Sequence, residues 1–188
     1  MKLKLAIILA AIIGVGVFVF QNQHASAPVS SSQVKATAKK TIAKVTQPAP
    51  KPSPCVSNTD AQTAIVSISQ QHAWFCEVSK QVYESAVTTG ASDYGDGTPL
   101  GTWHIQGKST NRTLTGADSR GSWNDHVDYW MPYDGDYGFH DSSWQTFDYG
   151  NLTKYKSDGS HGCVHLPLTA MSWLYNWAPV GATVTITS

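Results

Sequence analysis

Residues 63–88, TAIVSISQQHAWFCEVSKQVYESAVT, contain three short runs rich in β-branched and aromatic residues. Two polar pairs, Gln70-Gln71 and Ser79-Lys80, separate these runs. The runs are Thr63–Ser69, His72–Val78 and Gln81–Thr88. Runs of this kind with short polar connections predict three antiparallel strands that form a meander. This stretch therefore indicates a mainly β domain.

Shorter strands are predicted further along the chain. The candidates are Trp103–Ile105, Val127–Pro132, Tyr137–His140 and Ala182–Thr187. The segment Gly107–Asp125 is polar and lacks alternation, so we expect a long irregular loop there. The acids of Asp118–Asp136 lack the ligand spacing of a calcium site, and we expect this region to be a solvated loop.

Only one stretch of the domain has helical spacing. Pro167 suits the first turn of a helix, and Pro179 marks where the helix must already have ended. The residues expected on its apolar face are Leu168, Met171, Leu174 and Tyr175. The sequence therefore predicts a β-rich fold with a single packed helix.

The composition limits the classes of protein that the chain can belong to. With 188 residues, it has room for one domain with a sizeable core. Through Pro54 there are seven lysines and no acid, whereas the remainder holds all 13 acids and only six basic residues. An acidic globular part argues against nucleic-acid binding. The aromatic content of 11% excludes a wholly disordered chain.

The N-terminus predicts export from the cytoplasm. Lys2 and Lys4 precede an uncharged apolar run, and residues 5–23 are expected to act as a membrane anchor or a secretion signal. Residues 25–27 (ASA) match a cleavage pattern, but Pro28 follows directly, which favours an uncleaved anchor. We expect residues 1–27 to be the signal or anchor segment and 28–54 a disordered Pro/Ala/Ser/Lys-rich tether. Residues 55–188 form the predicted globular domain.

The chain has three cysteines: Cys55, Cys76 and Cys163. In an exported domain two of them usually pair. Cys55 precedes the first strand and Cys76 lies on the second, so strand pairing can bring them together. A disulfide there leaves Cys163 as a free thiol. Pairing of Cys163 with either of the others is the structural alternative.

Cys163 lies in the segment 160–165, SHGCVH, between two imidazoles. A neighbouring imidazole can accept the thiol proton and give a thiolate–imidazolium pair, which is the nucleophilic form of cysteine. Gly162 lets the backbone approach an acyl group, and the amides of Gly162 and Cys163 are candidate oxyanion donors. A further imidazole, His140, lies upstream beside Asp141.

These motifs resemble the YkuD-type L,D-transpeptidases. The family signature is an upstream His, a spacer, and then Ser/Thr-His-Gly-Cys with an apolar residue, which here is His140 followed by 160–164 (SHGCV). The blocks Tyr83–Ile105 and Trp130–His140 also resemble family segments. The resemblance covers about residues 63–187.

The resemblance implies a β-rich fold with the cysteine in a cleft and no cofactor or metal. Family members form an acyl-enzyme with a peptidoglycan stem tetrapeptide, release the terminal D-alanine, and make a 3→3 cross-link to a neighbouring stem. On matching positions, Cys163 is the nucleophile and His140 the general base. His161 shapes the site, and Ser160 and Gly162 belong to the substrate and oxyanion side. Acylation by carbapenems is also implied.

Two features depart from the family pattern. Nineteen residues separate His140 from Ser160, so we expect a longer flap there. His165 stands where the family commonly has Asn or Arg, and we hypothesise that it lines the donor site and makes the site sensitive to pH. Asp141 can orient His140, although a backbone carbonyl can do the same.

Other functions are compatible with the same residues. An L,D-carboxypeptidase would hydrolyse the acyl-enzyme with water. A wall-binding module would have a cysteine without a catalytic role. A zinc hydrolase is a further alternative, because a strand through residues 161–165 would place His161, Cys163 and His165 on one face, within reach of His140. The expected partners are peptidoglycan stem peptides and, through the N-terminal segment, the membrane. The protein is expected to be monomeric.

Overall fold

The computed structural model describes residues 52–188. The predicted anchor at residues 1–27 and all but the last three residues of the predicted tether lie outside the described residues. Within residues 52–188, no helix is both long and apolar enough to span a membrane.

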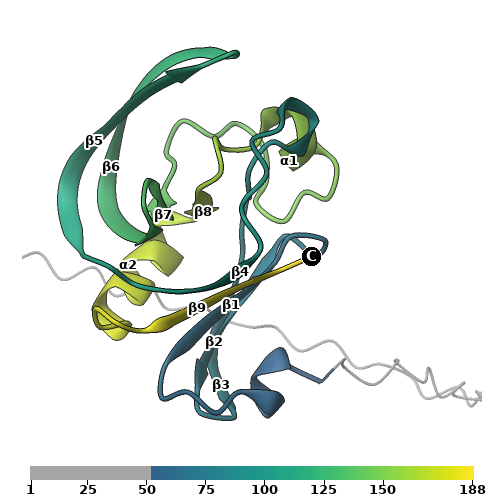
Figure 1. The fold of residues 1–188 in the computed structure, drawn as a ribbon, viewed down its shortest axis with the longest axis vertical. Helices are drawn as coiled ribbons and strands as arrows, with labels where there is room; N and C mark the ends of the chain where they lie inside the picture. Colours follow the sequence, from purple (N-terminus) through teal and green to yellow (C-terminus); the bar gives the residue numbers. More distant parts are fainter. Residues whose placement is uncertain (1–51) are drawn as a thin grey trace, which may run out of the picture. The chain divides into compact units, whose positions relative to one another are not determined.

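The predicted meander supplies three of the strands of a five-stranded sheet (Figure 1). Its strands are β1 (Thr63–Ser67), β2 (His72–Glu77), β3 (Lys80–Ala86), β4 (Gly101–His104) and β9 (Thr183–Thr187). The order across the sheet is β3-β2-β1-β9-β4. β9 lies parallel to β1 and antiparallel to β4, whereas β1, β2 and β3 pair antiparallel as the sequence predicts. The last strand of the domain, β9, therefore lies inside the sheet between β1 and β4.

A second sheet has the order β5-β6-β7-β8. Its strands are β5 (Ser109–Asp118), β6 (Gly121–Asp134), β7 (Tyr137–Asp141) and β8 (Val164–Leu166). β7 and β8 are parallel, and the other pairs are antiparallel. β5 and the start of β6 make a long curved hairpin (Figure 1), so the prediction of an irregular loop over 107–125 is wrong. Most side chains of β5 are exposed, which explains why no apolar alternation marks this strand in the sequence.

The helix prediction needs two corrections. The predicted helix is α2 (Leu168–Trp177), with Pro167 as its N-cap. The short helix α1 (Lys154–Asp158) was not predicted. Leu168 is 52% exposed and does not belong to the packed face. The buried residues of α2 are Ala170, Met171 and Leu174. Two short 3₁₀ segments, η1 (Pro54–Ser57) and η2 (Ser92–Tyr94), complete the fold.

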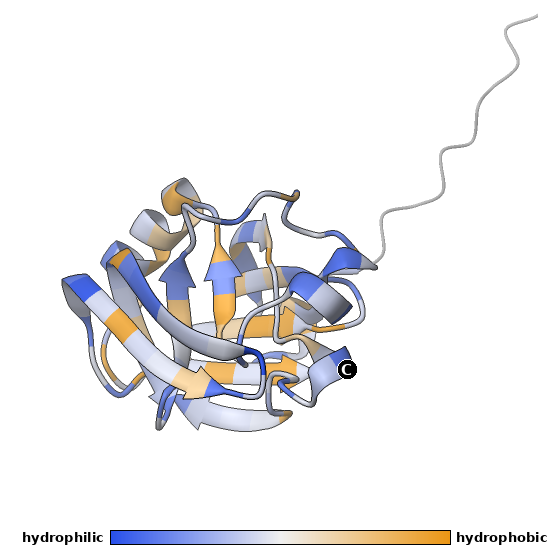
Figure 2. Ribbon diagram, turned by 90° about the horizontal axis from the view of Figure 1, so that it is seen from above, coloured by the Kyte–Doolittle hydropathy of each residue, from blue (hydrophilic) through white to orange (hydrophobic). Residues whose placement is uncertain are grey.

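Both sheets and α2 contribute to one apolar core. Phe75 of the first sheet packs at a ring-centroid distance of 5.4 Å from Trp173 of α2. In the second sheet, Val164 and Leu166 are fully buried and anchor β8. Burial of such a side chain contributes about 1.5–3 kcal/mol. Figure 2 shows the apolar residues as segments along the strands and α2.

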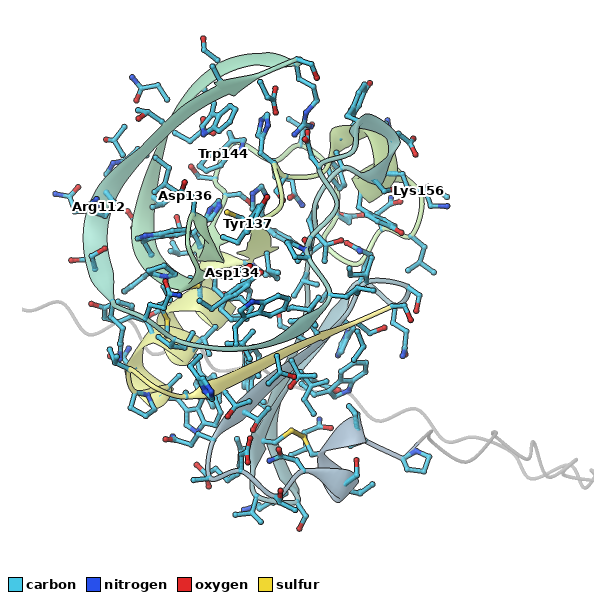
Figure 3. All side chains as sticks on the ribbon, in the orientation of Figure 1. Arg112, Asp134, Asp136, Tyr137, Trp144 and Lys156 are labelled. Carbon is cyan, nitrogen blue, oxygen red and sulfur yellow. A yellow bond between two sulfur atoms is a disulfide. The ribbon has the colours of Figure 1, made fainter. Side chains whose placement is uncertain are left out.

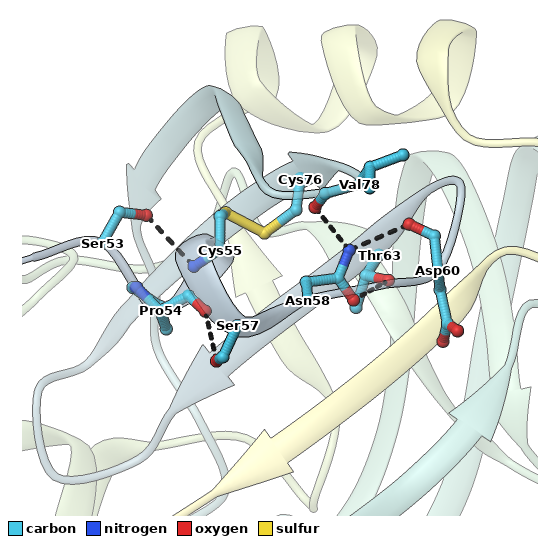
Figure 4. The surroundings of a disulfide bond; sticks show 9 residues. All are labelled: Ser53, Pro54, Cys55, Ser57, Asn58, Asp60, Thr63, Cys76 and Val78. Atoms are coloured by element: carbon cyan, nitrogen blue, oxygen red, sulfur yellow. Dashed lines mark hydrogen bonds between the residues drawn. A yellow bond between two sulfur atoms is a disulfide. The ribbon is translucent and has the colours of Figure 1, made fainter.

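A disulfide joins Cys55 of η1 to Cys76 of β2, as predicted (Figure 4). Both residues are fully buried. Beside them, the Asn58 amide donates hydrogen bonds to the carbonyls of Asp60 and Val78, which holds the segment before β1 against the end of β2. The third cysteine, Cys163, is free.

Removing this disulfide is expected to lower the free energy of unfolding by about 3 kcal/mol, because the sequence separation of 21 residues closes a sizeable loop in the unfolded chain. Urea titration of Cys55→Ala/Cys76→Ala against wild type, without reductant, measures the difference. Added reductant should destabilise wild type and leave the double variant unchanged. A loss below about 1 kcal/mol would contradict a stabilising role.

Candidate active site

The parallel pairing of β7 with β8 brings the two halves of the histidine–cysteine motif together. His140 and His165 are direct neighbours in the register of these strands, and Cys163 precedes β8 by one residue. Cys163 and His140 line one cleft of about 1150 Å³. The cleft is also lined by the β5–β6 hairpin, the turn before β7 and parts of the segment 144–161. In Figure 3, Asp136, Tyr137 and Trp144 lie beneath the arch of the hairpin.

Ser160 fixes the bend that presents the cysteine. Its hydroxyl donates to the Cys163 carbonyl at 2.6 Å and accepts from the Gly162 N–H at 3.0 Å. Its backbone N–H donates to the Thr89 carbonyl, and its own carbonyl accepts from the Ala91 N–H. Ser160 is buried and is therefore a structural centre of the loop, not a side chain that faces substrate.

Gly162 cannot be replaced without disturbing this bend. Its φ is +113°, a conformation that residues with a Cβ rarely adopt. A Cβ at this position would also overlap the ring of Tyr137. Because its N–H already donates to Ser160, the prediction that the Gly162 amide binds an oxyanion does not fit the structure. The Cys163 amide remains the candidate donor from this pair.

His140 is buried, and its Nδ1 lies 2.8 Å from the carbonyl oxygen of Asp141. That carbonyl can only accept, so Nδ1 carries the proton and Nε2 keeps a lone pair. The Asp141 carboxylate instead accepts the backbone N–H groups of Asp128 and Tyr129 at 3.1 and 2.8 Å. Asp141 therefore orients His140 through its backbone carbonyl, and its carboxylate binds the backbone of β6 instead.

The resting thiol and imidazole are both neutral. Burial lowers the pKa of His140 to about 4, against the opposing effects of the bond to Asp141 and its charge. Burial raises the pKa of the Cys163 thiol to about 12, against the opposing effect of the Gly138 N–H. The thiol lies 3.6 Å from the Asp136 carbonyl, a suitable acceptor for its proton. The expected thiolate–imidazolium pair is therefore not favoured in this arrangement.

His165 packs against His140. The rings of His140 and His165 lie 4.5 Å apart, and His165 Nδ1 lies 3.4 Å from Gln145 Oε1. The Trp144 ring lies beside both imidazoles, with ring-centroid distances of 6.0 Å to His140 and 5.9 Å to His165. Burial, followed by the neighbouring His140, lowers the pKa of His165 well below its usual value. His165 is thus neutral near pH 7, which argues against the hypothesis of pH sensing in that range.

His161 faces the hairpin. Its Nδ1 lies 2.5 Å from Asp118 Oδ2, and its ring stacks on Trp123 at 3.9 Å. β8 begins at Val164, so His161 and Cys163 do not share a strand face with His165. In residues 52–188, the single group spaced to hold a metal ion is Asp96, Asp118 and His161. That group does not contain Cys163, His140 or His165, so the structure does not support the zinc site expected from these residues.

The sequence did not indicate three supports of the site. Gln71 appeared to be a turn residue, but its side chain is fully buried and binds both the N–H and the hydroxyl of Thr89. Thr89 in turn accepts the Ser160 N–H. Arg120 donates to the carbonyls of Gly159 and Ser160. These contacts join residues 18 to 71 positions apart, and Gln71 has a positive φ of 47°, so no periodic pattern in the sequence marks them.

A family model matches most of the domain that contains this cleft. Residues 61–186 match the model of the YkuD L,D-transpeptidase catalytic domain, and the chain is a member of that family. No curated protein is significantly similar to it in sequence.

Solved structures of Enterococcus faecium L,D-transpeptidase are similar to the domain. Its catalytic domain, determined by NMR, is 32% identical, with a TM-score of 0.60, over 68% of this chain and 97% of that domain. The same domain acylated by ertapenem is 31% identical over the same shares, with a TM-score of 0.59. A crystal structure of a cysteine-to-serine mutant is 30% identical over 68% of this chain, with a TM-score of 0.62. This chain spans about half the length of that crystallised protein.

The neutral resting thiol predicts a distinct pH dependence of alkylation. Iodoacetamide reacts with the thiolate, so the rate constant for native Cys163 should rise about tenfold per pH unit from pH 6 to 9 without a plateau. Intact-mass time courses measure this rate, with Cys163→Ala as the unlabelled control. A rate independent of pH across this range would show a preformed thiolate–imidazolium pair and contradict the expectation.

Proposed function

We propose that the protein is a cysteine L,D-transpeptidase that acts on peptidoglycan stem tetrapeptides. Cys163 attacks the carbonyl that precedes the terminal D-alanine, and the resulting thioester is transferred to a side-chain amine of a neighbouring stem to give a 3→3 cross-link. The β7–β8 pairing carries this proposal, because it places a free thiol and an imidazole with an available Nε2 in one cleft. Family membership supports the same chemistry.

In the first half-reaction, the Cys163 proton passes to His140 Nε2 as sulfur bonds to the carbonyl carbon. Proton transfer and attack occur together, since the isolated thiolate is disfavoured in the buried site. The imidazolium then donates this proton to the departing nitrogen of D-alanine as the C–N bond breaks. His140 returns to the neutral base, and the acyl group remains on sulfur as a thioester.

In the second half-reaction, the neutral acceptor amine attacks the thioester carbonyl and gives its proton to His140. The tetrahedral intermediate collapses with loss of sulfur, which regains its proton from the imidazolium. In both halves the Cys163 N–H is the proposed donor to the developing oxyanion, because the Gly162 N–H is occupied by Ser160. A neutral His140 at physiological pH is able to act as the base throughout.

The cleft and the similar solved structures both support acylation of Cys163. The Enterococcus faecium catalytic domain has been described in an ertapenem-acylated form, and at 31% identity it supports an acylatable cysteine here. The cleft of about 1150 Å³ has room for a peptide rather than for a single small molecule. The Cys55–Cys76 disulfide supports a location outside the cytoplasm, where disulfides persist. Anchoring by residues 5–23, or secretion to the wall, belongs to the same proposal.

The main rival is an L,D-carboxypeptidase, in which water takes the place of the acceptor amine. Both enzymes share the acyl-enzyme, so the resting geometry of Cys163 and His140 fits either. A wall-binding module would not need a base with an oriented lone pair, and the bond between His140 and Asp141 therefore favours an enzyme.

Product analysis separates these functions. Purified domain is incubated with a disaccharide tetrapeptide, and products are identified by mass spectrometry. The proposal predicts a cross-linked dimer together with released D-alanine, and neither with Cys163→Ala. Tripeptide with no dimer would identify a carboxypeptidase. No D-alanine release from wild type would remove the enzymatic proposal.

A further inference from the structure

The tip of the β5–β6 hairpin is attached to the loop that carries the nucleophile. Arg120, in the turn between the two strands, donates from one terminal nitrogen to the Gly159 carbonyl at 3.2 Å and from the other to the Ser160 carbonyl at 3.0 Å. Its side chain is only 18% exposed. A planar guanidinium suits two adjacent carbonyls in a way that a lysine cannot reproduce.

A third segment holds the guanidinium in place. Arg120 Nε lies 2.8 Å from Asp96 Oδ2, and Asp118 Oδ2 lies 3.9 Å away. The ring of Tyr94 lies 5.4 Å below the guanidinium carbon. Arg120 belongs to the hairpin and contacts two other segments. One contains Asp96, in the body of the domain, and the other is the loop of Gly159 and Ser160 that leads to Cys163.

The carbonyl that Arg120 contacts belongs to the residue that organises the whole bend. Ser160 already receives the Ala91 N–H on that carbonyl, and its hydroxyl binds both Gly162 and Cys163. The body of the domain therefore restrains one side of the Ser160 peptide and the hairpin tip restrains the other. Movement of the tip would release one of these two restraints.

The next residue of the loop contacts the same hairpin. His161 binds Asp118 and stacks on Trp123, which lie on opposite strands of the tip. The contacts from Gly159, Ser160 and His161 to the tip are therefore consecutive along the loop. Most other residues of β5 are exposed, so these contacts hold the far end of the hairpin in place.

We propose that Arg120 is a positioning residue that couples docking of the hairpin tip to the reactive geometry of the Cys163 loop. The docked tip orders the Ser160 peptide, and the sulfur and the Cys163 amide then face the substrate carbonyl correctly. Its catalytic consequence rests on the proposed transpeptidase function, whereas the coupling itself concerns only the hairpin and the loop.

Kinetics of Arg120→Ala with the stem tetrapeptide test the catalytic consequence. D-Alanine release is expected to lose on the order of 100-fold in kcat, the effect of a misplacement of about 1 Å, with KM changed less than threefold. Methylguanidinium at tens of millimolar should restore part of the rate, and Arg120→Lys should be intermediate. Lys156→Ala removes an exposed charge from nearby α1, outside the lining of the cleft, and should match wild type.

Alkylation of Cys163 by iodoacetamide tests the coupling without any substrate. An undocked tip admits water to the sulfur, so Arg120→Ala should react at least about fivefold faster than wild type at pH 8, and methylguanidinium should reverse the increase. If wild type releases no D-alanine, the proposed function fails, but this comparison still decides the coupling.

Three results would overturn the proposal. The first is Arg120→Ala with kcat within threefold of wild type. The second is a rise in KM at unchanged kcat, which would make Arg120 a substrate-binding residue. The third is a loss of activity with unchanged alkylation and no response to methylguanidinium, which would indicate a general effect on stability.

Discussion

The site depends on one pairing, that of the short parallel strands β7 and β8. Parallel neighbours require a crossover connection, and residues 142–163 provide it. The pairing register sets His140 opposite His165, so that His140 and Cys163 line the same cleft. Val164 and Leu166 are fully buried, and their packing against the core keeps β8 in register. The long spacer between the two motif halves is thus free to form the wall of the cleft.

Desolvation of buried His140 and of partly exposed Cys163 governs the resting charge of the two groups. Desolvation disfavours both the thiolate and the imidazolium, and it outweighs the hydrogen bonds to the Asp141 carbonyl and from the Gly138 N–H, which favour the charged forms. The Asp141 carbonyl selects the tautomer of His140, and Ser160 selects the conformation of the loop. In the proposed mechanism, reactivity therefore depends on positioning, and charge develops only as the substrate is attacked.

The sequence predicted the parts of the fold that carry local patterns. The meander, the closing strand, α2 and the disulfide all follow from alternation, helical spacing or cysteine placement. The hairpin was missed because most side chains of β5 are exposed and give no alternation. The motif identified Cys163 and His140 as neighbours, but the diversion of the Gly162 amide to Ser160 and the role of Arg120 depend on three-dimensional contacts. Burial, which reverses the expected ionisation, is likewise a property of the packed structure.

The central claim is that the sulfur of Cys163 attacks an amide carbonyl in this cleft. Intact-mass spectrometry after incubation with a carbapenem tests it most directly, because a strained lactam amide is trapped as a stable thioester. A mass increase of one carbapenem on wild type, mapped to the peptide containing Cys163 and absent from Cys163→Ala, is the predicted result. An unmodified wild-type protein, or an adduct that persists in Cys163→Ala, would contradict the account.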